Sequence, residues 1–200
     1  MSWKLAAVIL GATVLAGAQA QEQAQESVVP EPDGYRTDNY RAAVPKTLAG
    51  VRVLATAEAE AIWRAGTGIF IDVLPRAPKP ANLPAGTVWR DMPRHNIPGS
   101  VWLPDTGYGK LAGPTEAYLR RGLERATGGN KAALMVIYCQ EDCWMSWNAA
   151  KRVLSYGYSS VAWYPDGTEG WERANLPLAE AQPEPRTDEE RSPAPVQGQQ

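Results

Sequence analysis

One segment in the second half of the sequence combines a buried strand, two cysteines and a helix. Residues 134–138 form an apolar run with β-branched members, which is typical of a short strand buried on both faces. Beyond it, apolar residues recur at helical spacing as far as Leu154, and Ser146 is a residue type that caps helix N-termini. Cys139 is therefore predicted to lie in a loop between the end of a strand and the start of a helix.

This position suits a reactive thiol, because the free N–H groups and the dipole at a helix N-terminus favour negative charge and lower a thiol pKa. Cys139 is the candidate nucleophile. Cys143 lies four residues later, and the protein has no other cysteine. Cys143 has three interpretations: it resolves a persulfide or sulfenic acid on Cys139, forms a permanent disulfide with it, or simply packs. A disulfide closing so short a loop should stabilise the fold by only about 2 kcal/mol, which favours redox or sulfur chemistry.

The rest of the chain alternates short apolar strands with helical patterns. Strands are predicted at residues 51–54, 68–73, 101–104 and 161–164, and helices follow Thr56 and Thr115. The alternation predicts an α/β fold, a single domain with a mainly parallel central sheet flanked by helices. Ligands in such folds bind beyond the carboxyl ends of the strands, where Cys139 is expected. Residues 77–84 contain three prolines and are predicted to be a loop near this site.

The two ends of the chain differ in composition from its middle. Residues 1–20 have the pattern of a secretory signal peptide, with Lys4, an apolar run and small residues before a cleavage point after Ala20. This pattern predicts export to an oxidising periplasm, and no later stretch resembles a membrane span. Residues 21–34 hold four acidic and no basic residues, and residues 179–200 hold five acidic and two basic ones.

Both of these acidic ends are rich in Gln, Glu and Pro, so they are predicted to be disordered, as a linker and a C-terminal tail. The folded domain is predicted to span residues 35–178, with an irregular arm over residues 35–50. This span holds seventeen basic and thirteen acidic residues, an excess too small to indicate nucleic-acid binding. The sequence has only two cysteines and one histidine, and their spacing does not match a metal-ligand pattern, so no metal site is predicted. No cofactor is expected to be required.

Four segments in their order along the chain resemble a single rhodanese-like domain between Val44 and Leu178. These are the strand ending in Asp72-Val73, the Ile-Pro-Gly-Ser turn and strand at 96–104, the strand that delivers Cys139, and the closing segment 157–177. The resemblance implies transfer of sulfane sulfur through a persulfide on Cys139. It also implies that backbone amides of the following loop hold that persulfide, often with basic side chains nearby.

The resemblance implies that the cysteine loop forms the binding site. The candidate binding residues are Gln140, Glu141, Asp142, Trp144, Met145 and Ser146, with Arg90 and Arg94 as sources of positive charge. Glu141 and Asp142 oppose thiolate formation if their carboxylates face the sulfur. If they point to solvent beside the helix N-terminus, their negative charge interacts favourably with the helix dipole. Trp144 is better explained by packing than by binding. Arg90 and Arg94 are better explained as ordinary surface arginines. His95 has a pKa range that would let it assist at the site.

The Cys-x-x-x-Cys-Trp arrangement, the arm around residues 38–45 and the Pro-rich insert are similar to a periplasmic subfamily. Its members are associated with PQQ-dependent (quinoprotein) alcohol catabolism. Three functions remain open. The first is a sulfurtransferase that acts on a small sulfur-containing substrate through a Cys139 persulfide. The second is a redox protein that cycles the Cys139–Cys143 disulfide with a periplasmic partner. The third is a non-catalytic module that binds a quinoprotein dehydrogenase, its cytochrome or a small ligand.

Overall fold

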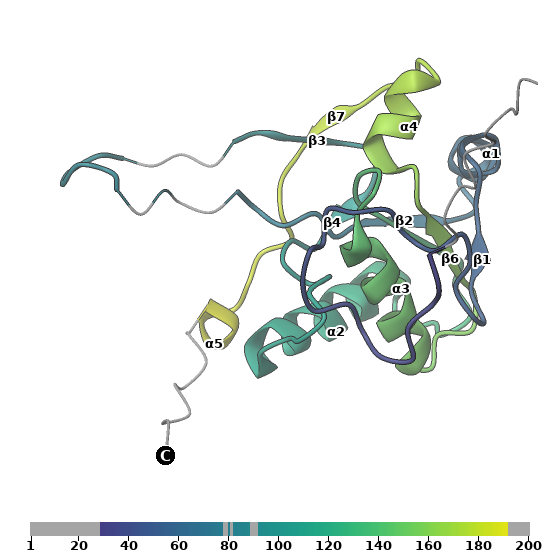
Figure 1. Cartoon of the computed structure of the whole chain (residues 1–200), viewed down its shortest axis with the longest axis horizontal. Helices are drawn as coiled ribbons and strands as arrows, with labels where there is room; N and C mark the ends of the chain where they lie inside the picture. The colour runs from purple at the N-terminus through teal and green to yellow at the C-terminus, as the bar shows by residue number, and fades with distance from the viewer. Residues whose placement is uncertain (1–28, 78–79, 81, 89–91, 192–200) are drawn as a thin grey trace, which may run out of the picture.

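A five-stranded parallel sheet forms the centre of the protein (Figure 1). The computed structural model describes residues 29–77, 80, 82–88 and 92–191. The strands lie in the order β1-β6-β5-β2-β4, so β5 is central. Their bounds are Arg52–Val53 (β1), Ile69–Asp72 (β2), Val101–Trp102 (β4), Met135–Tyr138 (β5) and Val161–Tyr164 (β6). The predicted α/β class with a mainly parallel sheet is confirmed.

Helices cover both faces of this sheet, and each face has its own apolar core. The bounds are Thr56–Ala65 (α1), Gly113–Thr127 (α2), Trp144–Ser155 (α3), Gly167–Arg173 (α4) and Asp188–Arg191 (α5). Met135 and Ile137 of β5 lie in the core with α2 and α3, whereas Val136 and Tyr138 lie in the core with α1 and α4. Successive side chains of a strand point to opposite faces of the sheet. A strand that is buried on both faces therefore has an uninterrupted run of apolar residues in its sequence.

Helix α3 begins three residues earlier than predicted, because Ser146 was the expected N-cap and Cys143 is the N-cap in the structure. Its N-cap is Cys143, with the extended backbone usual there (φ −122°, ψ 105°). The Ser146 hydroxyl donates to the Cys143 carbonyl at 3.1 Å and accepts a hydrogen bond from the Trp163 indole at 3.0 Å. The predicted cap was wrong because this hydroxyl is buried against β6. Cys143 is thereby placed at the helix terminus itself.

A small antiparallel ribbon, β3 (Arg94–Asn96) with β7 (Ala179–Ala181), lies beside the main sheet and was not predicted. Between β2 and β3 the described residues form an excursion from the domain, in which residues 82–88 lie away from the sheet (Figure 1). The described residues of the Pro-rich stretch within it have no helix or strand, as predicted. Among the described residues no helix is both long and apolar enough to cross a bilayer. The predicted signal peptide lies outside the described residues.

The N-terminal segment (residues 29–50) lies along α3, and this differs from the prediction of a disordered linker up to residue 34. The Lys151 ammonium of α3 donates to the carbonyl oxygens of Pro32, Asp33 and Gly34 at 2.9, 2.7 and 3.1 Å. These carbonyl oxygens are backbone groups, which every sequence carries. Composition therefore does not show that they can anchor a segment.

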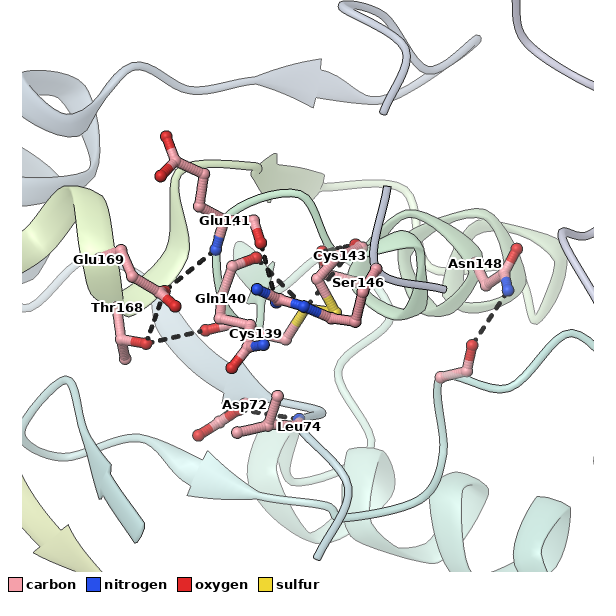
Figure 2. Close-up of a disulfide and its surroundings, with 12 residues drawn as sticks. Asp72, Leu74, Cys139, Gln140, Glu141, Cys143, Ser146, Asn148, Thr168 and Glu169 are labelled. Carbon is pink, nitrogen blue, oxygen red and sulfur yellow. Dashed lines mark hydrogen bonds between the residues drawn. A yellow bond between two sulfur atoms is a disulfide. The ribbon is translucent and has the colours of Figure 1, made fainter. Parts of the chain in front are cut away.

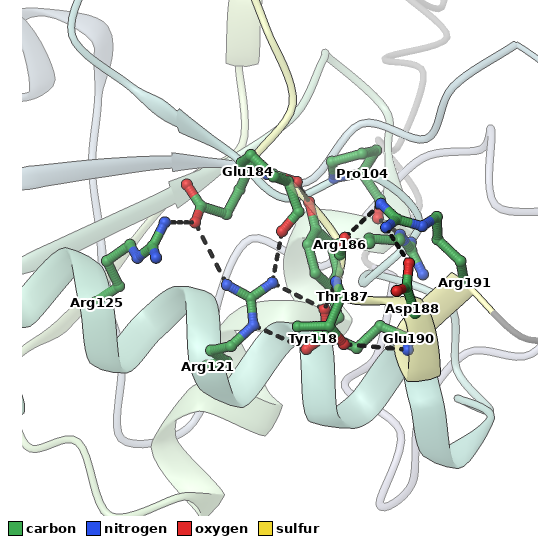
Figure 3. A network of polar contacts seen from close by, with 11 residues as sticks. Pro104, Tyr118, Arg121, Arg125, Glu184, Arg186, Thr187, Asp188, Glu190 and Arg191 are labelled. Carbon is green, nitrogen blue, oxygen red and sulfur yellow. Dashed lines mark hydrogen bonds and ion pairs between the residues drawn. The ribbon is translucent and has the colours of Figure 1, made fainter.

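The C-terminal segment (residues 179–191) likewise continues past the predicted domain boundary and packs on α2 (Figure 3). Arg121 donates to both carboxylate oxygens of Glu190 at 2.9 and 2.8 Å, and Arg125 to Glu184 at 2.7 Å. Glu190 is only 8% exposed. The sequence predicted a disordered tail because acidic side chains usually face solvent. In the structure, the acidic side chains of this segment are instead paired with arginines of α2.

Candidate functional site

Cys139 and Cys143 form a disulfide at the carboxyl end of β5 (Figure 2). Cys139 directly follows Tyr138, the last residue of the strand, and Cys143 is the N-cap of α3. The exposed fractions of the two cysteines are 0% and 2%. The predicted junction of strand and helix is confirmed, and the two cysteines are bonded to each other. Within the described residues, no cluster of three or more His, Cys, Asp or Glu could hold a metal ion.

Two carbonyl oxygens lie near the Cys139 sulfur. Its Sγ lies 3.6 Å from the Gln140 carbonyl oxygen and 3.7 Å from that of Cys143. A thiol can donate a proton to such oxygens, but a thiolate is repelled by them. These two oxygens favour a neutral sulfur at Cys139 over a thiolate.

Two backbone amides of the loop are occupied by the protein's own acceptors. The Glu141 amide donates to the Glu169 carboxylate at 3.1 Å (Figure 2), and the Trp144 amide donates to the Tyr40 carbonyl at 2.9 Å. A free anion that used these donors would have to displace a carboxylate or a backbone carbonyl. Glu169 was not predicted, because its position in the sequence gives no indication of this contact.

The Cys139 backbone is held by a buried ion pair and a threonine. Arg94 donates through Nε to Asp72 at 2.8 Å and through Nη2 to the Cys139 carbonyl at 3.2 Å, and the Thr168 amide reaches the same carbonyl at 3.3 Å. Complete burial raises the pKa of Asp72, because it disfavours the charged carboxylate, and Arg94 acts in the opposite direction. Arg94 is therefore no surface arginine; its side chain is 12% exposed and its charge is directed to Asp72.

The two acidic side chains of the loop, Glu141 and Asp142, have different surroundings. Arg173 of α4 binds the Glu141 carboxylate with two hydrogen bonds of 2.7 and 2.8 Å and lowers its pKa. Figure 2 shows this carboxylate turned away from both cysteines, as in the interpretation that directs it to solvent. Asp142 is exposed and has a positive φ of 50°. The loop is acidic in sequence, but the charge of Glu141 is paired outside the sulfur site.

Three further candidate binding residues are buried in the core. Trp144, Met145 and Ser146 are 2%, 7% and 0% exposed. The Trp144 indole donates to the Ala43 carbonyl at 3.0 Å and meets Trp147 edge-on, with 5.4 Å between ring centroids. This confirms packing as the explanation of the tryptophans. Arg90 lies outside the described residues.

A cavity of about 550 Å³ opens beside the loop at the carboxyl ends of the strands. Its lining comes from the two ends of the excursion between β2 and β3, from α4 and from Gln140, and it includes Arg94, His95, Thr168 and Glu169. The predicted proximity of the Pro-rich insert to the cysteine loop is confirmed for these flanking residues. The cavity lies on the side of the Cys139 carbonyl, to which Arg94 and Thr168 donate.

The N-terminal segment covers the other side of the cysteine loop. The Ala42 amide donates to the Asp142 carbonyl at 3.1 Å, and Arg41 stands opposite Cys143 in an antiparallel bridge. The Arg41 guanidinium donates to the Glu141 carbonyl at 2.9 Å. Arg41 was not among the predicted site residues, because no local pattern links positions about a hundred residues apart.

The comparison with known families is decisive for classification: the rhodanese-like domain model matches residues 62–174. The chain belongs to the rhodanese-like domain family. The matched region includes both cysteines of this rhodanese-like protein and leaves out the N-terminal segment and the C-terminal segment. No curated protein sequence matches the chain.

Two solved structures are similar to this rhodanese-like protein. One is the solution structure of the 30 kDa polysulfide-sulfur transferase homodimer from Wolinella succinogenes, at 17% identity and a TM-score of 0.42, covering 66% of this chain and 80% of that one. The other is an uncharacterized protein from Saccharomyces cerevisiae, at 19% identity and a TM-score of 0.37, covering 62% of this chain and 92% of that one.

Proposed function

We propose that the protein performs sulfane-sulfur and thiol redox chemistry through the Cys139–Cys143 pair. The observation that carries the proposal is the bond between the two cysteines at the junction of β5 and α3. Two thiols that can meet are able to take up a sulfur atom and release it without a metal or an organic cofactor. The rhodanese-like fold, which delivers Cys139 at a strand end, supports the same chemistry.

The reaction begins with the reduced pair. One cysteine thiolate attacks the outer sulfur of a persulfide donor, forming a cysteine persulfide and releasing the donor as a thiolate. The second cysteine attacks the inner sulfur of that persulfide, so the disulfide forms and the outer sulfur leaves as hydrogen sulfide. A protein or small-molecule dithiol then reduces the disulfide and becomes oxidised itself. The persulfide is a transient intermediate, and no bound cofactor takes part.

The test uses the reduced full-length protein with a persulfide or polysulfide donor under anaerobic conditions. We expect sulfide release and a protein mass about 2 Da below that of the dithiol. A single-cysteine variant that keeps the accepting thiol should stop at a mass about 32 Da higher, because no second thiol can displace the sulfur. The Cys139→Ser/Cys143→Ser double variant is the control. Sulfide release by that variant, or none by the wild type, would refute the proposal.

We further propose that the protein acts in the periplasm, in association with PQQ-dependent alcohol catabolism. The signal-like pattern of residues 1–20 and the likeness of the arm and the Cys-x-x-x-Cys-Trp arrangement to that subfamily support this location and pathway. Its redox partner would then be a periplasmic thiol protein. Fractionation of cells that express the full chain tests the location; recovery in the cytoplasm with residues 1–20 retained would contradict it.

The second candidate function is a binding module for a quinoprotein dehydrogenase or its cytochrome. The observation in its favour is that Glu169 and the Tyr40 carbonyl already occupy amides of the loop. A module of this kind would bind its partner with both thiols removed. Binding measurements with the double cysteine variant separate the two functions: unchanged affinity together with absent sulfur uptake favours the module.

A further inference from the structure

We propose that Cys143, with Arg41 as its counter-ion, is the attacking thiolate, and that Cys139 is the buried thiol that closes the disulfide. This inference rests on the proposed function and reverses the order that the family resemblance implies. Three features of the described residues support it: the position of Cys143 at a helix terminus, the cation opposite it, and the carbonyl oxygens around Cys139.

The first feature is the N-cap position of Cys143. An N-cap side chain can accept hydrogen bonds from the second and third amides of its helix, and α3 has twelve residues. With the sulfurs bonded to each other, α3 has no side-chain cap. Reduction frees the Cys143 sulfur, and as a thiolate it can supply this missing cap and interact favourably with the helix dipole.

The second feature is the pairing of Arg41 with Cys143. The Ala42 amide donates to the Asp142 carbonyl and the Trp144 amide to the Tyr40 carbonyl, so hydrogen bonds flank the pair on both sides. Directly opposed residues of this kind are the closely spaced ones of an antiparallel ladder, and their side chains leave on the same face.

The contacts of the Arg41 guanidinium keep it over the loop. It donates to the Glu141 carbonyl and, with the Gln140 amide oriented to present its oxygen, to that oxygen through Nε and Nη2 at 3.0 Å each. Both contacts are to uncharged oxygens. The Arg41 side chain is exposed, so it can meet a persulfide or polysulfide anion that approaches from solvent.

The other charged groups near the loop are directed elsewhere. Arg173 is bound by Glu141, and Arg94 by Asp72 on the far side of the Cys139 backbone. The Glu169 carboxylate accepts from the Glu141 amide. Asp142 is exposed, and the Arg36 guanidinium stacks over Trp144 at 5.2 Å.

The third feature is the environment of Cys139, whose sulfur faces the carbonyl oxygens of Gln140 and Cys143. These oxygens favour a protonated thiol at Cys139. In the reaction, the Cys143 thiolate takes the outer sulfur of the donor, which leaves as a thiolate. The Cys139 sulfur then attacks the Cys143 sulfur while its proton passes to the outer sulfur. The Cys139 proton leaves with the departing sulfide, which is released as hydrogen sulfide.

The decisive experiment is a thiolate titration of the two reduced single-cysteine variants, followed by ultraviolet absorbance so that burial does not limit the readout. The Cys139→Ser variant keeps Cys143, and its pKa should lie at least about one unit below the unperturbed value near 8.5. The Cys143→Ser variant keeps Cys139, and its pKa should be at or above that value. The opposite order would overturn the inference and restore Cys139 as the nucleophile.

Arg41 is tested in the Cys139→Ser background. Arg41→Gln should raise the Cys143 pKa by about one unit and slow iodoacetamide labelling at pH 7 by about tenfold, whereas Arg41→Lys should restore most of both. Arg52→Gln removes a cation that pairs with Glu58, and it should change neither. Arg173→Gln removes a cation from the outer side of the loop and should change the Cys143 pKa and the labelling rate less than Arg41→Gln does. An equal effect would show that any nearby positive charge lowers the Cys143 pKa, which would contradict the assignment of Arg41.

These outcomes separate this inference from the proposed function. A low Cys143 pKa that depends on Arg41, without sulfide release from any donor, would leave the inference standing and refute the function. Sulfide release with equal, unperturbed pKa values at both cysteines would do the reverse.

Discussion

The N-terminal segment and the C-terminal segment both lie on helices of the same face of the sheet, but different groups hold them. The N-terminal segment is bound to α3 and the cysteine loop mainly through its backbone, as in the contacts of Lys151 and Asn148. The C-terminal segment is bound to α2 mainly through carboxylates, of which Glu190 is the most buried. The first attachment should therefore depend less on acid and salt than the second.

The largest expected effect comes from Asn148→Ala in α3. The Asn148 amide accepts from the Arg36 amide at 2.9 Å and donates to the carbonyls of Arg36 (2.9 Å) and Gly107 (3.1 Å). Since its removal leaves these backbone groups unpaired, we expect the free energy of unfolding to fall by about 2 to 4 kcal/mol. Denaturant unfolding measures the loss. The disulfide should also be reduced faster by dithiothreitol, because the segment that covers it is loosened.

Asn148→Asp is the matched variant, since it keeps the size of the side chain and its acceptor but replaces the donor with a carboxylate oxygen that faces the carbonyls of Arg36 and Gly107. Because Asn148 is fully buried, this variant should be destabilised about as much as Asn148→Ala at pH 7, and it should recover part of the loss at low pH, where the carboxyl group is protonated and can donate again. A disulfide that is reduced at the wild-type rate in Asn148→Ala would show that the N-terminal segment does not control access to the cysteines.

The second effect concerns Glu190 in the C-terminal segment. Hydrogen bonds from Arg121, and then from the Thr187 amide, lower the pKa of Glu190 from 4.5 to about 2. A depressed carboxyl pKa contributes stability above pH 4.5 that is lost as the pH falls towards 2. Glu190→Gln should therefore lower the unfolding free energy by about 1 to 2 kcal/mol at pH 7 and by less at pH 3.

Thermal unfolding of both proteins at the two pH values measures this difference. At pH 7, high salt should reduce the gap between them, because about 1 M salt screens exposed charges beyond roughly 3 Å. Proteolysis after Leu178 should become faster under the same conditions, while cleavage within the N-terminal segment should not. If the difference in stability between the wild type and Glu190→Gln does not change with pH, packing and not the ion pair holds this segment.

The smallest effect is expected for Lys151→Met. Methionine keeps an apolar stem beside the Trp147 ring, over which the ammonium lies 4.8 Å from the centroid, but it cannot donate to the three carbonyls. We expect a loss of about 1 kcal/mol, because the ammonium is partly hydrated in the folded state. Hydrogen exchange should show faster opening of residues 29–34 with the cysteine loop unchanged. Equally faster hydrogen exchange in residues 29–34 and in the cysteine loop would show that the N-terminal segment and the loop open as one cooperative unit.

Local patterns were enough to predict the α/β class, the buried strand before Cys139 and the two helices α1 and α2. Both helices end at a glycine with left-handed backbone, φ 61° in each case. These features depend on residues that are close in sequence: apolar spacing sets the element, and the glycine ends it. The position of Cys139 at a strand end follows from the same local signals.

Tertiary structure alone decided what surrounds the two sulfurs. Arg41 stands opposite Cys143, Glu169 occupies the Glu141 amide, and Arg94 is directed to Asp72. Each of these contacts joins segments from 22 to about a hundred residues apart, and their side chains carry no periodicity that marks a partner. The same holds for the two ends of the described chain. Their composition correctly shows that they have little apolar area to bury. The contacts that hold them are made by backbone carbonyls and carboxylates, and these contacts depend on where α2 and α3 place their arginine, lysine and asparagine side chains.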